Sequence, residues 1–233
     1  LMTLLWLVSV RLRDASIVDP WWSISFLLVT VHTAVHTGLT PAKWLLLAVV
    51  STWSLRLWLH LLWRSRGQPE DPRYANFRRQ YGPERYWWVS FFQVFVLQGC
   101  LVLVISTPLQ VAAAATGPDP IGLLQWAGLV VFVVGFVCEA LADAQLQTFR
   151  RDPLNKGKVM DSGLWHWSRH PNYFGEALLW WGLWLFALGQ PYGWATIFAP
   201  ALMTFLLLRV SGVTMLDAHL TSTKPGYADY VRR

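Results

Sequence analysis

The sequence predicts an all-α, polytopic membrane protein with about seven transmembrane helices. Of its 233 residues, 55% are hydrophobic and only 14% are charged, whereas a soluble domain is about one quarter charged. The apolar residues form continuous runs and do not alternate with polar ones, which favours helices over the strands of a membrane barrel. This composition excludes a soluble globular domain, a disordered chain and a collagen-like chain.

The predicted spans follow from the apolar runs taken in order along the chain. Crossing the hydrocarbon core takes about 20 residues as a helix, and only the first run is much shorter than this. Backbone polar groups in lipid need partners inside the same segment, so the runs are expected to be helical. No internal repeat or low-complexity linker interrupts them, which indicates a single domain. The predicted spans are 1–10, 17–35, 42–63, 87–105, 121–142, 173–188 and 194–213.

The positions of the basic residues support this count and give an orientation. Sixteen of the 19 Lys and Arg residues lie after the first, third and fifth spans or in the C-terminal tail. Because basic loops are retained in the cytoplasm, we expect the N-terminus outside and the C-terminus in the cytoplasm. The remaining loops are nearly neutral, and the Ala- and Gly-rich stretch 107–120 is expected to be a simple connection.

Charge and cysteine content exclude several kinds of partner. The net charge of +6 reflects membrane topology, so we expect no nucleic-acid partner. Cys100 and Cys138 both lie in apolar runs without a CxxC pair, which argues against a disulfide scaffold or a zinc ribbon. We expect no metal ion and no obligate protein partner.

Several ionisable residues lie within or at the edge of the spans. Such residues are costly in lipid and are functional by default, although a polar lock between helices or snorkelling at a helix end is the alternative for each one. Together they indicate a polar cavity that opens to the cytoplasm. They are Asp19, Arg56, His60, Glu139, Asp143, Glu176, Arg209 and Asp217. On a continuous helix, Glu139, Asp143 and Arg150 share one face.

The segment 161–176 carries the densest set of polar side chains. Gly163 permits a tight turn, and Pro171 fits the first turn of a helix, where no backbone donor is lost. We therefore expect a helix to begin near His170. Its free N–H groups would face the cytoplasmic loop and attract an anion or a carboxamide. An ordinary helix start with interfacial Trp anchors is the alternative.

This segment resembles the steroid 5α-reductase family, with the bacterial branch the most similar. The likeness is carried by Ser-Arg-His-Pro-Asn-Tyr-Phe-Gly-Glu at 168–176, by Arg-Gly-Gln-Pro-Glu-Asp-Pro-Arg-Tyr at 66–74, and by Lys-Pro-Gly-Tyr-Ala-Asp-Tyr in the tail. It covers most of the chain from Asp19 onward. The resemblance implies NADPH-dependent reduction of a carbon–carbon double bond conjugated to a ketone, in a 3-oxo-4-ene steroid or a similar enone lipid.

The resemblance also implies an organisation and a location. The chain would be a single integral-membrane reductase domain over 1–233, with substrate-side helices in 1–105 and the NADPH-binding part in 121–233. We expect it in the bacterial inner membrane, surrounded by membrane lipid, with the cofactor site facing the cytoplasm.

Matching positions carry the family's cofactor contacts onto this sequence. Asp143 and Arg150 match contacts to the ribose and phosphates, and Lys158 lies where another basic phosphate contact is expected. Asn172 and Glu176 match residues at the nicotinamide end. The complete predicted cofactor set is Asp143, Arg150, Lys158, Arg169, His170, Asn172, Tyr173, Glu176, Arg209 and Asp217. Asp217 departs from the animal enzymes, which have Tyr there.

The predicted catalytic group rests on the same resemblance. The animal enzymes use a Glu on an early span and a Tyr on the next, and Asp19 matches the Glu. It would donate to the ketone in its protonated form, which burial of a carboxyl group in an apolar site favours. The third span has no Tyr, so the second donor is open. The polar candidates there are Trp53, Ser54, Arg56 and His60.

Two other classes of function are open to this sequence. Membrane methyltransferases of the isoprenylcysteine type share an Arg-His-Pro-x-Tyr-x-Gly-Glu segment and use S-adenosylmethionine. That cofactor has no phosphates, and those enzymes carry a paired Glu-Glu near the last helix, where this chain has Met215, Leu216 and Asp217. A seven-span receptor or a transporter is the non-enzymatic alternative, but repeated halves and broken midplane helices, common in transporters, are not visible.

Overall fold

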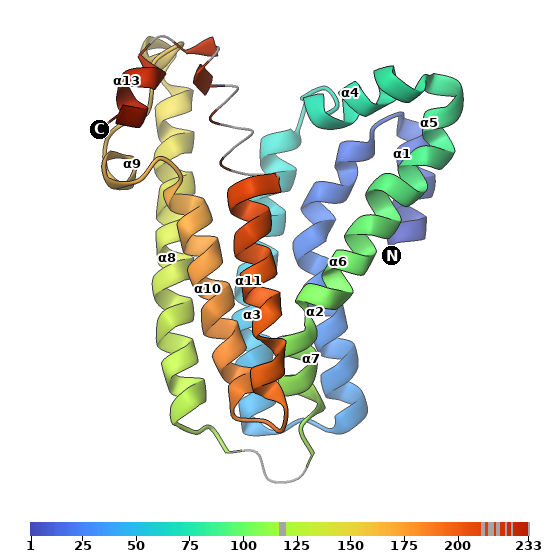
Figure 1. Cartoon of the computed structure of the whole chain (residues 1–233), viewed down its shortest axis with the longest axis vertical. Helices are drawn as coiled ribbons and strands as arrows, with labels where there is room; N and C mark the ends of the chain where they lie inside the picture. The colour runs from blue at the N-terminus through green and yellow to red at the C-terminus, as the bar shows by residue number, and fades with distance from the viewer. Residues whose placement is uncertain are drawn as a thin grey trace. The chain divides into compact units, whose positions relative to one another are not determined.

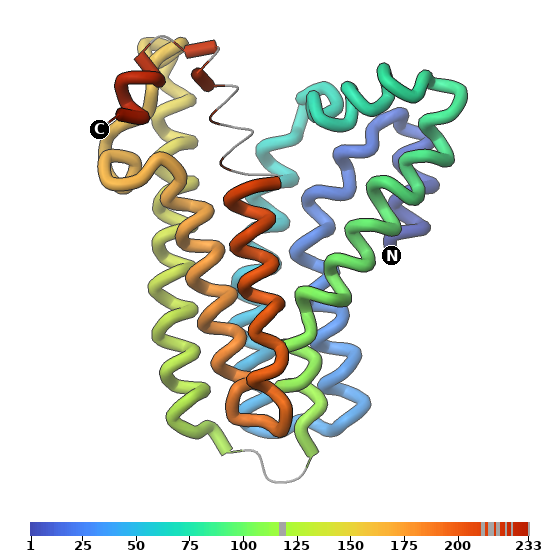
Figure 2. Tube along the Cα trace, viewed as in Figure 1, coloured from blue at the N-terminus to red at the C-terminus, as the bar shows by residue number. Residues whose placement is uncertain are grey.

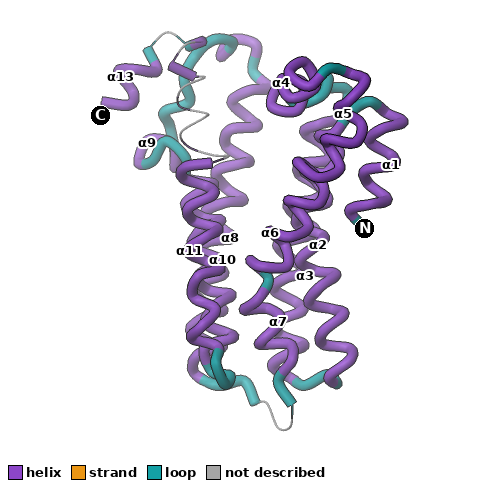
Figure 3. Tube along the Cα trace, turned by 45° about the vertical axis from the view of Figure 1, so that its right-hand side comes forward, coloured by secondary structure: helices purple, strands orange, loops and turns teal. Residues whose placement is uncertain are grey.

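The computed structural model of the chain is helical throughout its main segments (Figure 3). It describes residues 1–116, 120–210, 213, 217, 220, 221, 223, 224 and 226–232, and within these ranges it contains no strand. Among them, four helical stretches are long and apolar enough to cross a membrane: Pro41–Ser65, Pro83–Ile105, Leu123–Arg151 and Gly193–Val210. The all-α class is confirmed, while the count of seven spans and the orientation stay predictions.

Helices form at each of the seven predicted runs. Residues 211 and 212 of the last run lie outside the described residues. The corresponding helices are α1 (Met2–Leu12), α2 (Val18–Thr37), α3 (Pro41–Ser65), α6 (Leu97–Ile105), α8 (Leu123–Arg151), α10 (Pro171–Leu188) and α11 (Phe198–Phe205). A π-helical turn, Leu206–Val210, extends α11.

One predicted connection is helical. The expectation of a simple loop over 107–120 was wrong for Thr107–Ala114, which forms α7. Pro108 lies in its first turn and Ala is the strongest helix former, so the local sequence favours a helix. The Thr37 hydroxyl donates to the Ala113 carbonyl at 2.6 Å, which fastens α7 to the end of α2.

The chain forms two compact units, Leu1–Pro120 and Ile121–Arg233. The boundary falls in the stretch that separates the predicted substrate-side and NADPH-binding parts. The expectation that these parts make a single reductase domain stays a prediction.

In the first unit, α2 and α3 pack lengthwise as an antiparallel pair (Figure 1). The buried Ser23 hydroxyl donates to the Ser54 carbonyl at 2.9 Å. In the first turn of α3, Lys43 is only 1% exposed. Its ammonium donates to the Thr37 hydroxyl and the Gly38 carbonyl, each at 2.7 Å, and so stabilises the end of α2.

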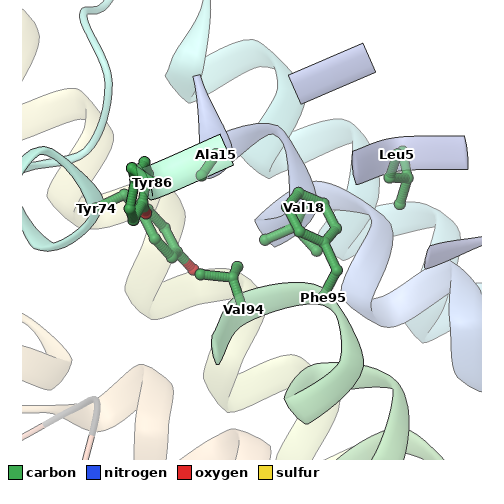
Figure 4. Packing of buried hydrophobic residues seen from close by; sticks show 7 residues of the cluster. All are labelled: Leu5, Ala15, Val18, Tyr74, Tyr86, Val94 and Phe95. Carbon is green, nitrogen blue, oxygen red and sulfur yellow. The ribbon is translucent and has the colours of Figure 1, made fainter. Parts of the chain in front are cut away.

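At the opposite end of this unit, α4 (Pro72–Tyr81) and α5 (Pro83–Ser90) lead through a π-helical turn (Phe91–Val96) into α6. These elements pack on the junction of α1 and α2 in one apolar cluster (Figure 4). Its members are Leu5, Ala15, Val18, Tyr74, Tyr86, Val94 and Phe95. This packing holds Tyr74 beside the first turn of α2.

In the second unit, α8 and α10 run side by side (Figure 2). Glycines let the two backbones meet, as small residues do where membrane helices pack closely. A Cβ atom on Gly135 would lie 2.5 Å from the Leu179 nitrogen, and one on Gly175 would lie 2.5 Å from the Glu139 nitrogen. The first turns of α10 are therefore fixed against the polar stretch of α8.

Gly175→Ala is expected to destabilise the second unit by about 2 kcal/mol, because the helices must move apart to admit the methyl group. Thermal unfolding in detergent should show a lower midpoint. Gly189→Ala is the control, since its Cβ atom would meet the movable Gln125 amide at 3.2 Å. Equal midpoints for the two variants would contradict the close packing.

Candidate functional site

The segment before α10 is docked on α8 by backbone and side-chain hydrogen bonds. Gly163 has φ +61° and makes the predicted tight turn. The Gln145 side chain accepts from the Leu164 nitrogen at 3.0 Å, and the Trp165 indole donates to the Ala142 carbonyl at 3.0 Å. The short helix α9 (Leu164–Trp167) is held in this way. Helix α10 then begins at Pro171, as predicted.

Asp143 and Asn172 join α8 to the first turn of α10. The Asn172 amide donates to Asp143 Oδ1 at 3.1 Å, and Asp143 is only 9% exposed. The Asn172 Oδ1 atom is also buried, and no donor among the described residues lies within hydrogen-bond distance of it. A buried acceptor without a donor is unusual and indicates a place for a ligand group or a water.

A second cluster surrounds Asp217. Its carboxylate accepts from Arg169 Nη1 at 2.7 Å, is bonded to His170 Nε2 at 2.7 Å, and accepts from the Tyr227 hydroxyl. Burial acts to raise the pKa of Asp217, but the hydrogen bonds from Tyr227 and His170 and the charge of Arg169 outweigh it and lower that pKa. Burial lowers the pKa of His170 despite Asp217. Asp217 therefore orients the two residues that precede α10.

The two residues that Asp217 binds before α10 border a cavity of about 330 Å³. Arg169 and His170 form one side of it, and the His170 ring stacks on Tyr173 with centroids 5.5 Å apart. The rest of the lining includes Phe174, Thr204 and Leu207. The cavity therefore combines a polar edge with an apolar wall, as small-molecule sites commonly do.

Basic residues gather at the end of α8 and in the tail. Arg150 and Lys158 are exposed. The Lys224 ammonium donates to the Lys158 carbonyl at 2.6 Å, and the charge of Arg150 acts on Lys224. Two further predicted residues lie elsewhere on this unit: Glu176 is half-buried one turn after Asn172, and Arg209 is exposed near the end of the π-helical turn.

Asp19, in the first unit, lies in the first turn of α2 and binds residues of α4. The Tyr74 hydroxyl donates to Asp19 Oδ1 at 2.6 Å, and Arg73 Nη2 donates to Oδ2 at 2.6 Å. Arg73 Nε also donates to Asp71 at 2.9 Å, and the Gln98 amide donates to the Tyr74 oxygen at 3.1 Å. The carboxylate therefore has a cationic partner and a neutral donor.

The electrostatics of this cluster keep the proton on Tyr74. Burial, and then the charge of Asp19, raise the pKa of Tyr74. Burial alone would lower the pKa of the Arg73 guanidinium, but the hydrogen bond to Asp71 and the charge of Asp19 raise it. Glu70 fixes the preceding loop by accepting from the Ala15 nitrogen at 2.8 Å. Tyr74 is thus a protonated donor held in one orientation.

The other members of the predicted catalytic set lie along α3. Trp53 is buried on α3 against Phe26, with ring centroids 5.9 Å apart, and Arg56 and His60 are half-buried farther along α3. Within the described residues, the side-chain contacts of Asp19 run to α4 instead.

Four contact residues of these clusters were not predicted from the sequence: Tyr74 and Arg73 in the first unit, and Lys224 and Tyr227 in the second. In both units the sequence contained a feature that could have indicated these residues. These residues lie in the segment 66–74 and in the tail, which contribute to the resemblance. Across the described part of the chain, no three His, Cys, Asp or Glu side chains come together in a group able to hold a metal ion.

Comparison with known proteins identifies the family. The profile of DUF1295, described as a protein of unknown function, matches residues 5–233. The chain belongs to this family. DUF1295 proteins are membrane proteins similar to the steroid 5α-reductases.

Two fungal proteins are similar to this family member. The uncharacterized protein C594.04c of Schizosaccharomyces pombe is 28% identical over 207 residues, covering 78% of this chain and 60% of that protein. The probable O-methyltransferase ustE of Ustilaginoidea virens is 38% identical over 66 residues, covering 28% of this chain and 23% of that protein. The matches thus span less than two thirds of either relative. No solved structure matches the chain.

Proposed function

We propose that this DUF1295 protein is an integral-membrane reductase that uses NADPH to saturate the 4,5 double bond of a 3-oxo-4-ene steroid or a similar enone lipid. The observation that carries the proposal is the polar site of the second unit. There, Asn172 in the first turn of α10 donates to the buried Asp143 of α8, and the exposed, basic Arg150 and Lys158 belong to the same unit. Family membership supports it, because DUF1295 proteins resemble the steroid 5α-reductases.

The residues of this site fit a phosphorylated nicotinamide nucleotide. Arg150 and Lys158 would hold its phosphates, since basic side chains bind such oxygens through charge-assisted hydrogen bonds. The buried Asn172 Oδ1 atom, which has no donor among the described residues, would accept a hydrogen bond from an N–H or O–H group of the nucleotide. When bound, NADPH supplies a hydride. We also propose that the site faces the cytoplasm in the bacterial inner membrane, and that the chain needs neither nucleic acid nor an obligate protein partner.

The Asp19 cluster of the first unit would polarise the ketone of the substrate. Addition of hydride to the β-carbon moves negative charge onto the carbonyl oxygen, and a donor aimed at that oxygen stabilises the resulting enolate. The Tyr74 hydroxyl keeps its proton, and it would take this role by turning its single O–H from Asp19 to the ketone oxygen when the substrate binds. The enolate then takes up one proton from water at the α-carbon to give the saturated ketone.

This assignment changes the role expected for Asp19. The sequence predicted a protonated acid that donates to the ketone, and that protonation state stays a prediction. In the structure Asp19 Oδ2 lies 2.6 Å from Arg73 Nη2, and Oδ1 accepts from Tyr74. We propose that Asp19 orients Tyr74 and Arg73, and that Tyr74 supplies the second donor that the third span lacks.

One observation favours a second function, transfer of a methyl group from S-adenosylmethionine. A relative that is 38% identical over 66 residues is named a probable O-methyltransferase. S-adenosylmethionine carries no phosphate, so this function leaves the basic group around Arg150 and Lys158 unexplained.

The deciding assay is NADPH oxidation by detergent-purified protein, with and without progesterone, followed by product analysis. Steroid-dependent oxidation that yields a product with a saturated A-ring is expected. Methylation of a lipid substrate, with no steroid-dependent oxidation, would replace the proposal with the second function.

A further inference from the structure

The C-terminal tail brings one lysine to the basic end of the nucleotide site. The Lys224 ammonium donates to the Lys158 carbonyl at 2.6 Å. Farther along the tail, the Tyr227 hydroxyl donates to Asp217, and the Tyr230 hydroxyl donates to the Trp165 carbonyl. Three tail side chains thus bind the segment 158–170 or its partner Asp217, so several contacts fix the position of Lys224.

The electrostatics of this position favour an anion. Lys224 is partly buried, and burial followed by the charge of Arg150 lowers the pKa of its ammonium. Bringing like charges together costs free energy, and a bound anion relieves that cost. An ammonium has three N–H donors. Among the residues that the structure describes, the Lys158 carbonyl takes one of them, and the other two are left for phosphate oxygens.

We infer that Lys224 binds a phosphate monoester of the ligand and so makes the site prefer NADPH to NADH. This inference rests on the proposed function. The two nucleotides differ only in the 2′-phosphate, a monoester that carries a charge of about −1.5 to −2 near neutral pH. Lys is suited to it as a compact point charge. A lysine that only fastened the loop would affect both nucleotides equally.

The test compares dissociation constants for NADPH and NADH in the full-length protein and in Lys224→Gln. The variant should weaken NADPH binding by about tenfold or more and change NADH binding less than about twofold. Lys224→Arg should restore most of the preference because it keeps the charge. Arg232→Gln is the control for loss of a tail charge, since the Arg232 side chain is 79% exposed and pairs with the exposed Asp229.

Equal losses for NADPH and NADH in Lys224→Gln, or no loss for either, would overturn the inference. If the unmodified protein binds neither dinucleotide, the proposed function fails. Adenosine 2′,5′-bisphosphate and adenosine 5′-monophosphate then decide the role of Lys224 separately. If the unmodified protein binds the bisphosphate more tightly than the monophosphate, and Lys224→Gln abolishes this difference, the role of Lys224 is supported. If the unmodified protein binds the two ligands equally, the role is refuted.

Discussion

Tyr74→Phe is expected to lower the rate of steroid-dependent NADPH oxidation by about 100-fold or more, the usual cost of removing a donor to a developing oxyanion. The variant keeps the ring and its packing and removes only the hydroxyl that Asp19 and Gln98 hold. NADPH binding should not change, because Tyr74 belongs to the first unit and the nucleotide residues to the second. Single-turnover kinetics and a separate binding titration distinguish the two effects.

Asp19→Asn extends this test to the orienting carboxylate. We expect it to lose most turnover and to keep NADPH binding. Because Asp19 acts through Tyr74, the double variant should lose little more than the worse single variant, which a double-mutant cycle measures. Tyr81→Phe is the matched control, since Tyr81 is an exposed tyrosine of the same helix. Normal turnover in both Tyr74→Phe and Asp19→Asn would show that this cluster has no catalytic role.

The second large effect is expected on nucleotide binding. Asn172→Ala should raise the dissociation constant of NADPH by about 10- to 100-fold, because it removes a donor to the buried Asp143 and the acceptor offered to the ligand. Arg150→Ala should also weaken binding first, through loss of a phosphate contact. Isothermal titration with the purified protein measures both.

Arg232→Ala serves as the control for these binding variants, because its side chain is exposed. A thermal-unfolding midpoint for each variant checks that the protein stays folded. If Asn172→Ala and Arg150→Ala both stay folded and bind NADPH as tightly as the unmodified protein, the assignment of the nucleotide site is wrong.

The sequence predicted local features of the second unit well. Pro171 predicted the start of α10, and Gly163 predicted the turn. The fifth span was predicted to end at 142, but α8 continues to Arg151, so Glu139, Asp143 and Arg150 do lie on one helix. These features depend on backbone preferences within a few residues, which a single sequence expresses directly.

The partners of the site residues were harder to predict. Tyr74 is 55 residues from Asp19, and Lys224 is 66 residues from Lys158. Such contacts depend on how α4 and the tail fold back, which local periodicity does not encode. The glycine contact between α8 and α10 was missed for the same reason, because it needs Gly135 and Gly175 to face each other.

The central claim is that the polar site of the second unit binds a phosphorylated nicotinamide nucleotide. The most direct test measures the affinities of the detergent-purified protein for NADPH and for S-adenosylmethionine side by side. We expect saturable NADPH binding that Asn172→Ala weakens, and no competition by S-adenosylmethionine. Tight binding of S-adenosylmethionine with no binding of NADPH would contradict it.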